Sequence, residues 1–164
     1  GHAVQCAMPY LPDNIKDVII LCGDVPLLTS QTILNLANNH ILKSRVVSVL
    51  AVQMDNPTGY GRMVVDKDRN VSQIVEQADA TEAQKEINII NTGVYCINRK
   101  FLEEALSKLE SNNAQGEYYL TDIVKIGNTE NKVVGMMLGE NAVEFSGINS
   151  VEHLKAVEAI LEAG

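Results

Sequence analysis

The feature that most constrains the fold of this 164-residue chain is a continuous apolar run, Val18 to Cys22, which ends at Gly23-Asp24. Three of its five residues are β-branched, which favours a strand. A run that is apolar at every position is typical of a strand buried on both faces, as in a parallel sheet. We therefore expect an α/β fold in which Asp24 lies just past the carboxyl end of a buried strand.

The rest of the chain alternates strand-like and helix-like stretches. Strands are expected over residues 18–22, 45–52, 61–65, 71–76, 88–97, 132–138 and 142–145. Helices are expected from Thr29 or Ser30, over 80–86, from Asn98, and over 119–125 and 150–162. The last helix is amphipathic, and we expect its apolar residues to face inward: Val151, Leu154, Val157, Ile160 and Leu161. This alternation, with one hairpin, predicts a mixed, mostly parallel sheet.

Charge and hydropathy exclude two classes of partner. The chain has 13 basic and 21 acidic residues, for a net charge of −8. Binding to nucleic acid needs a basic surface that releases phosphate counterions, so no nucleic-acid partner is expected. A phosphate ligand is still compatible, because backbone N–H groups and a metal can bind it. The apolar runs are far shorter than the roughly 20 residues of a membrane span, and no leader sequence is evident, so we expect no membrane partner.

The three cysteines predict neither a disulfide framework nor a zinc knuckle, because their number is odd and no C-x-x-C occurs. Cys22 and Cys96 lie in apolar runs, where cysteine behaves as a small buried hydrophobe. Unpaired cysteines of this kind favour a reducing, cytoplasmic setting.

The three histidines, His2, His40 and His153, are isolated in sequence, and none has a ligand partner at zinc spacing. We expect His40 and His153 to be solvated. No G-x-S-x-G, Walker or Rossmann glycine motif occurs either. The motif inventory therefore favours none of the commonest nucleophile-based or nucleotide-loop chemistries.

Two residues are candidate metal ligands. Asp24 follows a strand, and ligands of open α/β sheets bind outside the carboxyl ends of strands. Asn149 lies between a late strand and the last helix, where it could add a neutral oxygen ligand to a Mg²⁺ site with Asp24. The structural alternatives are a turn cap for Asp24 and a helix cap for Asn149.

Other candidates are polar residues beside apolar runs. In Thr58 to Arg62, two glycines around a tyrosine allow either close backbone approach to a ligand or a tight turn. Glu76, Asn91 and Glu117 border apolar runs, and a polar group there needs a partner. Sugar hydroxyls would suit carboxylate and amide groups, and a structural hydrogen bond is the alternative.

Taken together and in order, these segments resemble one family. They are Gly1–Ala3, Leu21–Leu27, Pro57–Arg62, Ile74–Glu76, Asn91–Gly93, Asn113–Asp122 and Gly147–Asn149. Over essentially all of its length the chain resembles the uridylyltransferase domain of the bacterial bifunctional N-acetylglucosamine-1-phosphate uridylyltransferase/glucosamine-1-phosphate acetyltransferase family. The strings PTGYGR and NAQGEYYLTD carry most of this resemblance.

The resemblance implies a Rossmann-like nucleotidyltransferase fold and a reaction of UTP with N-acetylglucosamine 1-phosphate, giving UDP-N-acetylglucosamine and pyrophosphate. By the same resemblance Asp24 and Asn149 would hold Mg²⁺, and no protein nucleophile is implied. The implied substrate-binding residues are Gly1, Gly61, Glu76, Asn91, Tyr119 and Thr121. Gly1 would touch the nucleoside, and the others would line the sugar pocket.

Two parts of that family are not matched: an N-terminal strand with a glycine-rich phosphate loop, and a C-terminal β-helix. We expect residues 1–149 to be a partial, N-terminally truncated nucleotidyltransferase domain and 150–164 a linker helix. Without the phosphate loop, little or no uridylyl transfer is expected from this chain alone. The exposed sheet edge could pair with a complementing chain or form a homo-oligomer. A non-catalytic sugar-phosphate-binding or interaction fragment is the alternative function.

Overall fold

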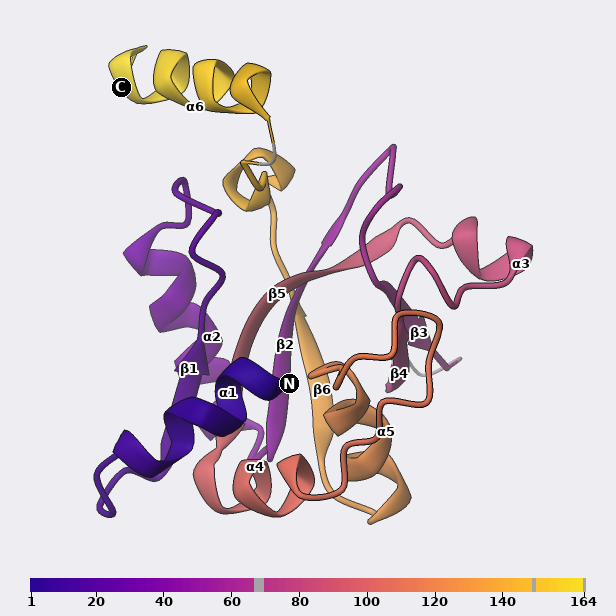
Figure 1. Ribbon diagram of the computed structural model, residues 1–164. Helices are drawn as coiled ribbons and strands as arrows, with labels where there is room; N and C mark the ends of the chain where they lie inside the picture. The colour runs from indigo at the N-terminus through magenta and orange to yellow at the C-terminus, as the bar shows by residue number, and fades with distance from the viewer. Residues whose placement is uncertain (67–69, 149, 164) are drawn as a thin grey trace.

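The computed structural model describes residues 1–66, 70–148 and 150–163. Its centre is a six-stranded sheet with the order β4-β3-β5-β2-β6, in which β1 also pairs with β5 (Figure 1). The strands are β1 (Asp17–Ile20), β2 (Val47–Gln53), β3 (Arg62–Val65), β4 (Val71–Val75), β5 (Ile89–Asn98) and β6 (Val134–Leu138). β1 and β3 lie on the same side of β5, β1 against its second half and β3 against its first.

Helices cover both faces of the sheet. They are α1 (His2–Ala7), the 3-10 turn η1 (Met8–Tyr10), α2 (Ser30–Leu42), α3 (Glu82–Lys85), α4 (Arg99–Leu106), α5 (Asp122–Thr129), the 3-10 turn η2 (Ala142–Phe145) and α6 (Val151–Ala163). On one face, α4 and α5 pack against β2 and β5 through a buried apolar core. On the other face, Leu36 of α2 and Phe145 of η2 pack against Leu50 and Val52. Residues 47–52 are accordingly buried on both faces.

The mixed sheet is confirmed, with one refinement. β1, β2 and β3 all pair antiparallel with β5, and β6 pairs parallel with β2, so four of the six strands point the same way. β5 runs in the opposite direction between them. Most of the hydrogen-bonded pairs are therefore antiparallel, although most strand directions agree.

The first apolar run forms a shorter and less buried strand than expected. β1 spans only Asp17–Ile20, and Ile19 and Leu21 are exposed. Val18 and Ile20 pack against the core on the α4–α5 face. Burial on both faces, as predicted for this run, is therefore wrong here, because α2 reaches the face that carries Ile19 only at Asp17, through His40, and leaves Ile19 38% exposed.

Three further expectations are wrong. Residues 142–145 form the turn η2 rather than a strand, because Asn141 Oδ1 accepts the Val143 N–H at 3.0 Å and starts a helical turn. Of the five apolar residues expected to face inward in α6, Val157 is buried, whereas Val151, Leu154, Ile160 and Leu161 are exposed, since the helix projects from the sheet (Figure 1). Cys22 is exposed, because it lies beyond the end of β1. Among the described residues, no helix combines the length and apolar character needed to cross a bilayer.

His40 is buried rather than solvated. It lies in the last turn of α2 with only 2% of its surface exposed. Its Nδ1 is 2.9 Å from Ser48 Oγ of β2, and its Nε2 is 3.4 Å from Asp17 Oδ1 of β1. This contact ties α2 to two strands. Burial lowers the His40 pKa below 6.5 and nearby Arg45 lowers it further, while Asp17 opposes the shift.

A lowered pKa makes His40 a source of stability that is present above pH 6.5 and lost as the pH falls, because the unfolded chain binds the proton more readily. We expect His40→Gln to be less stable than the parent by about 1–3 kcal/mol at pH 8, since a buried hydrogen bond is lost. The difference in the free energy of unfolding between parent and variant should become smaller towards pH 5. Urea unfolding of both chains at pH 8, 6.5 and 5 measures this difference, and a value that does not change with pH would contradict the prediction.

Candidate functional site

A bulge in β5 creates the site. Val49 pairs with Tyr95 and Ala51 pairs with Asn91, so residues 92–94 oppose the single residue Leu50. Gly93 takes the positive φ of 79° that this bulge needs. Thr92 Oγ1 donates to the Leu50 carbonyl at 2.7 Å, which replaces a ladder hydrogen bond. The bulge therefore explains why polar Asn91-Thr92 interrupts an apolar strand.

A cavity of about 250 Å³ lies at this bulge, where β1 ends and β3 begins along β5. Four of the expected site residues line it: Asp24, Gly61, Glu76 and Asn91. They come from segments far apart in sequence, and the strand order brings them together. The other lining residues are Cys22, Val25, Gly59, Tyr60, Thr92, Gly93, Phe145 and Gly147.

Glu76 follows β4 and is the partly buried acid of this cavity. Its Oε1 accepts a hydrogen bond from Thr121 Oγ1 at 2.9 Å, which brings a fifth expected residue into the site. Its Oε2 faces Gly61, only 3.2 Å from where a Cβ on that glycine would lie. Burial raises the pKa of Glu76, Asp122 and Asp79 add to the rise, and the hydrogen bond from Thr121 opposes it.

Gly61 and Asn91 are joined directly by their backbones. The Asn91 N–H donates to the Gly61 carbonyl at 2.8 Å. The Asn91 Oδ1 accepts the Gly93 N–H at 3.0 Å, and Asn91 also hydrogen-bonds the buried Tyr95 hydroxyl. Gly61 is buried, with Ile74 and Glu76 on the side where a side chain would project. A substrate at Asn91 would therefore meet Gly61 and Glu76 on the same wall.

Asp24 lies at the exposed rim of the cavity. Among the described residues no cation forms an ion pair with its carboxylate, and no three Asp, Glu, His or Cys side chains gather as a metal site. Its backbone carbonyl accepts the Ile148 N–H at 2.8 Å, which holds the segment before residue 149 against it. Asn149 itself lies outside the described residues. An oxygen-donor set of one carboxylate and one amide suits Mg²⁺ when phosphate and water complete the shell.

Two expected substrate residues stand apart from the cavity lining. Gly1 is packed against Tyr118, whose carbonyl oxygen lies 2.5 Å from where a Cβ on Gly1 would be. Tyr119 donates its hydroxyl to Gln115 Oε1 at 2.7 Å. The expected helix at 119–125 begins only at Asp122, so Tyr119 lies on the preceding loop.

The model of the nucleotidyl transferase family matches residues 1–142 of this chain. The chain belongs to the nucleotidyl transferase family. It is similar to the protein named bifunctional protein GlmU of Clostridioides difficile (strain 630), with 44% identity over 161 residues, covering 98% of this chain and 35% of that relative. The protein of the same name from Corynebacterium efficiens is 41% identical over 173 residues, covering 100% of this chain and 36% of the relative.

This nucleotidyl transferase chain thus spans about a third of the length of its curated relatives. The resemblance to a bifunctional family expected from the motifs is confirmed. Two solved structures show the same fold. A glucose-1-phosphate thymidylyltransferase described as putative, from Bacillus anthracis, aligns over 97% of this chain and 59% of its own, with TM-score 0.69 and 18% identity. A CMP:2-keto-3-deoxy-manno-octonic acid synthetase aligns over 99% and 67%, with TM-score 0.68 and 15% identity.

The sequence pattern does not single out several residues that line the candidate site. Cys22 lies beside the bulge, with its thiol 3.6 Å from the Gly93 carbonyl. Tyr60 lines the cavity between the two glycines, and Phe145 lines it from η2. The PTGYGR string, which suggests a ligand contact at its glycines, could have pointed to Tyr60. Phe145 falls in the strand expected over residues 142–145, and only its packing against the sheet shows that it lines the cavity.

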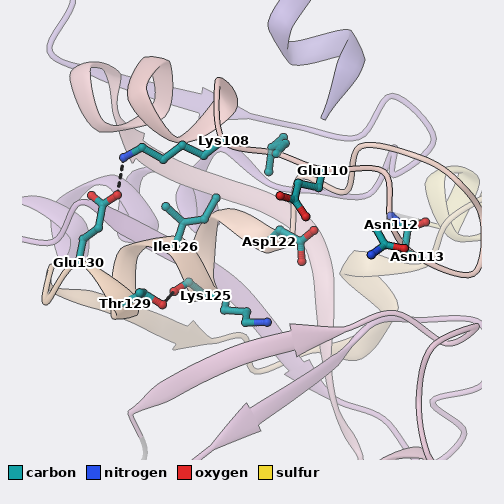
Figure 2. A pocket seen from close by; sticks show the side chains of 10 residues that line it. Lys108, Glu110, Asn112, Asn113, Asp122, Lys125, Ile126, Thr129 and Glu130 are labelled. Carbon is teal, nitrogen blue, oxygen red and sulfur yellow. Dashed lines mark hydrogen bonds and ion pairs between the residues drawn. The ribbon is translucent and has the colours of Figure 1, made fainter.

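A larger hollow of about 420 Å³ lies elsewhere on the nucleotidyl transferase domain, between the loop after α4 and helix α5 (Figure 2). Lys108 and Glu130 form an ion pair at one side of it (Figure 2). Glu110 and Asp122 lie beside each other on its opposite side (Figure 2). Neither Asp24 nor any of the expected substrate residues lines this hollow, so the smaller cavity at the bulge remains the candidate site.

Proposed function

We propose that this chain carries the sugar-phosphate part of a nucleotidyltransferase active site, which joins UTP and N-acetylglucosamine 1-phosphate to give UDP-N-acetylglucosamine and pyrophosphate. The cavity that gathers Gly61, Glu76 and Asn91 beside Asp24 carries the proposal. It presents the carboxylate of Glu76, the amide of Asn91 and the backbone of Gly61, which suit the hydroxyl and amide groups of an acetylated sugar. The motif resemblance supports the choice of sugar and nucleotide.

In this reaction an oxygen of the sugar phosphate attacks the α-phosphorus of UTP. The new bond forms in line with the bond from that phosphorus to the β-phosphate bridge, which breaks and releases pyrophosphate. The chain supplies positioning rather than a nucleophile. Glu76, held by Thr121, would bind sugar hydroxyls, and Asn91 would fix the sugar against Gly61. Tyr119 and Gly1 are proposed as further contacts to the sugar and to the nucleoside.

Asp24 and Asn149 are the residues we propose to hold a divalent cation, Mg²⁺ in the proposed reaction. When bound, this ion supplies charge neutralisation for the phosphate oxygens. The hydrogen bond between Ile148 and the Asp24 carbonyl supports the pairing, because it fixes the backbone directly before residue 149. Asp24 carries the only negative charge of this pair, so its carboxylate would contribute most of the attraction for the cation.

The proposal also bears on partners and location. Within the described strands β1 pairs only with β5, so its other edge is open to a complementing chain or a second copy. All three cysteines are free, which supports a reducing, cytoplasmic setting. Binding of a sugar phosphate without turnover is the second candidate function, which the open edge favours because a further strand could pair there.

The test has a binding arm and a turnover arm. Calorimetry should show N-acetylglucosamine 1-phosphate binding to the chain, whereas N-acetylglucosamine lacking the phosphate should bind more weakly. Pyrophosphate release from UTP and the sugar phosphate should then be measured after co-expression with the N-terminal segment of a bifunctional relative. Binding with no turnover favours the second candidate, and no binding contradicts both.

In the turnover arm, Asp24→Asn should raise the Mg²⁺ concentration needed for half-maximal rate by about tenfold, because an amide oxygen attracts the cation less than a carboxylate does. Asp55→Asn is the matched control, since Asp55 is also an exposed loop aspartate but does not line the cavity. An unchanged Mg²⁺ dependence in Asp24→Asn would remove Asp24 from the metal site.

A further inference from the structure

Arg62, the first residue of β3, is a buried cation that has no carboxylate partner in the part of the chain that the structure describes. Only 1% of its surface is exposed, and among the described residues its guanidinium forms no ion pair. Burying a charge that neutral groups alone must satisfy is costly, so a core position without a further role would favour an apolar side chain. The burial of Arg62 therefore indicates that its hydrogen bonds have a structural role that offsets this cost.

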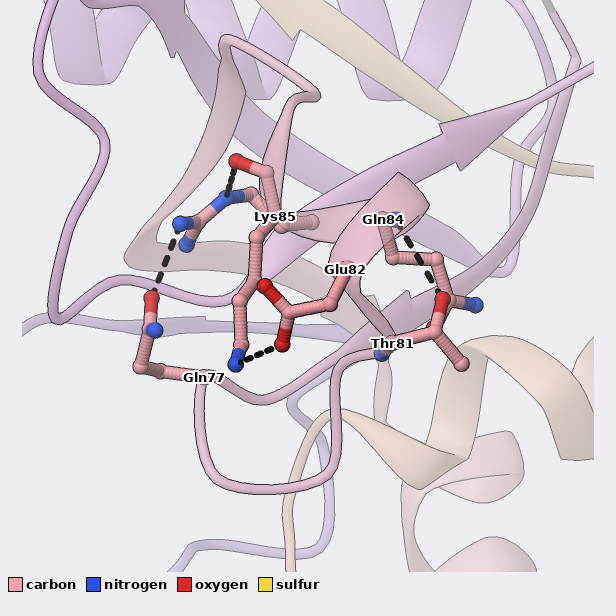
Figure 3. A network of polar contacts seen from close by, with 6 residues as sticks. Gln77, Thr81, Glu82, Gln84 and Lys85 are labelled. Atoms are coloured by element: carbon pink, nitrogen blue, oxygen red, sulfur yellow. Dashed lines mark hydrogen bonds and ion pairs between the residues drawn. The ribbon is translucent and has the colours of Figure 1, made fainter.

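Its guanidinium donates to three acceptors on three separate segments. Nη1 donates to the Tyr60 carbonyl, Nη2 to Gln77 Oε1 at 2.8 Å, and Nε to the Lys85 carbonyl at 3.4 Å. Gln77 Oε1 also accepts the Gly59 N–H at 3.2 Å. Figure 3 shows Gln77, from the segment after β4, near Lys85 of α3 within this network.

Each of these segments carries one residue of the candidate site. Gly61 lies between Tyr60 and Arg62, and Glu76 directly precedes Gln77. α3 leads into β5, where Ile90 pairs with Arg62 and Asn91 donates to the Gly61 carbonyl. One planar group thus restrains the backbone beside Gly61, the residue after Glu76, and the end of α3, from which the chain runs into β5 and Asn91.

We propose that Arg62 is a positioning residue for the candidate site, which holds Gly61, Glu76 and Asn91 in register by clamping their three segments. This inference rests on the proposed function. Arginine suits the role because its fork presents several N–H donors in a fixed plane, whereas lysine offers a single point of attachment. Gln77 adds to this clamp, because its Oε1 accepts hydrogen bonds from both Arg62 and the Gly59 N–H.

The experiment compares the parent chain with Arg62→Lys, Arg62→Met, Gln77→Ala and Gln77→Glu. Binding of N-acetylglucosamine 1-phosphate is measured by calorimetry, and amide hydrogen exchange at Gly59 and Asn91 by NMR. Arg45→Lys is the matched control, because Arg45 also donates to a neutral side chain and a backbone carbonyl, at Asn39 and Met136, away from the cavity.

We expect Arg62→Lys, Arg62→Met and Gln77→Ala to bind the sugar phosphate about tenfold more weakly and to exchange the Gly59 amide faster, since each loses a hydrogen bond of the clamp. Gln77→Glu keeps the acceptor oxygen and should bind as the parent does. Arg45→Lys should unfold more easily yet bind unchanged. Rescue by Gln77→Glu distinguishes positioning from general destabilisation.

The other possible results also test the positioning role of Arg62. If the parent binds the sugar phosphate and the Arg62 and Gln77→Ala variants bind equally well, the positioning role is wrong. If the parent does not bind, the proposed function fails, and the exchange rates alone test the clamp: unchanged rates at Gly59 and Asn91 overturn it. If Arg62→Met does not fold, Gln77→Ala carries the test, because it removes one acceptor and leaves the cation in place.

Discussion

Glu76→Gln is expected to weaken binding of N-acetylglucosamine 1-phosphate by about a hundredfold while making the chain more stable at neutral pH. The carboxylate accepts from Thr121 through one oxygen and turns the other towards Gly61 and the cavity. A hydrogen bond to a charged group contributes about 1.5–3 kcal/mol, and a sugar hydroxyl bound to the free oxygen would lose this charge. Calorimetric titration of the parent and the variant measures the loss.

The stability change follows from the sign of the pKa shift. Burial raises the Glu76 pKa above its ordinary value of 4.5, so the folded chain holds the proton more tightly than the unfolded chain. The stability from this group is present below pH 4.5 and is lost as the pH rises through the folded pKa. Glutamine resembles the protonated acid, so Glu76→Gln should be more stable than the parent at pH 7 and equal to it below pH 4.5.

Urea unfolding at pH 4 and pH 7 separates the two effects. Glu86→Gln is the matched control, because Glu86 is exposed and lies outside the cavity lining, and it should change neither binding nor stability. A variant that binds weakly but is less stable at pH 7 would mean that the charge of Glu76 is compensated by the fold. A gain in stability with loss of binding is the trade-off expected of a binding residue.

Gly93→Ala should destabilise the chain by about 2–5 kcal/mol. The positive φ of 79° costs a non-glycine residue about 1–2 kcal/mol. In addition, a Cβ would lie 2.5 Å from Cys22 Sγ, which forces the thiol or the bulge to move and costs about 1–3 kcal/mol more. Because both costs act at the bulge, sugar-phosphate binding should weaken as well. Urea unfolding of parent and variant gives the difference in free energy.

Two further variants separate strain from collision. Gly116→Ala has a positive φ of 67° with open space around it, so it measures strain alone. In Cys22→Ala/Gly93→Ala the thiol is gone and the remaining contact, to the Cys22 Cβ at 3.9 Å, is ordinary, so the double variant should recover the collision cost. If Gly93→Ala costs no more than Gly116→Ala, the collision with Cys22 plays no part.

The fold class and most elements could be predicted from local pattern. β2, β3, β4 and β5 lie where the β-branched runs occur, and the helices after Thr29 and Asn98 begin at side-chain caps. Both the periodicity and the caps are properties of a few neighbouring residues, so the sequence displays them. The errors fall where the outcome depends on what covers a face. Ile19 is exposed, and so are four apolar residues of α6: Val151, Leu154, Ile160 and Leu161. His40 is buried between β1 and β2, the strands on either side of α2 in the sequence.

For the candidate site, the sequence by itself determined the residue types: an acid after a strand, a glycine pair around a tyrosine, and polar residues inside apolar runs. Only the tertiary structure decided which of these meet. The bulge at residues 92–94 opens the space, and the order of β1, β5 and β3 brings Asp24, Glu76 and Gly61 around it, while Tyr119 turns to Gln115. Contacts between segments far apart in the chain depend on strand register and on backbone conformation at one glycine, neither of which any single stretch of sequence expresses.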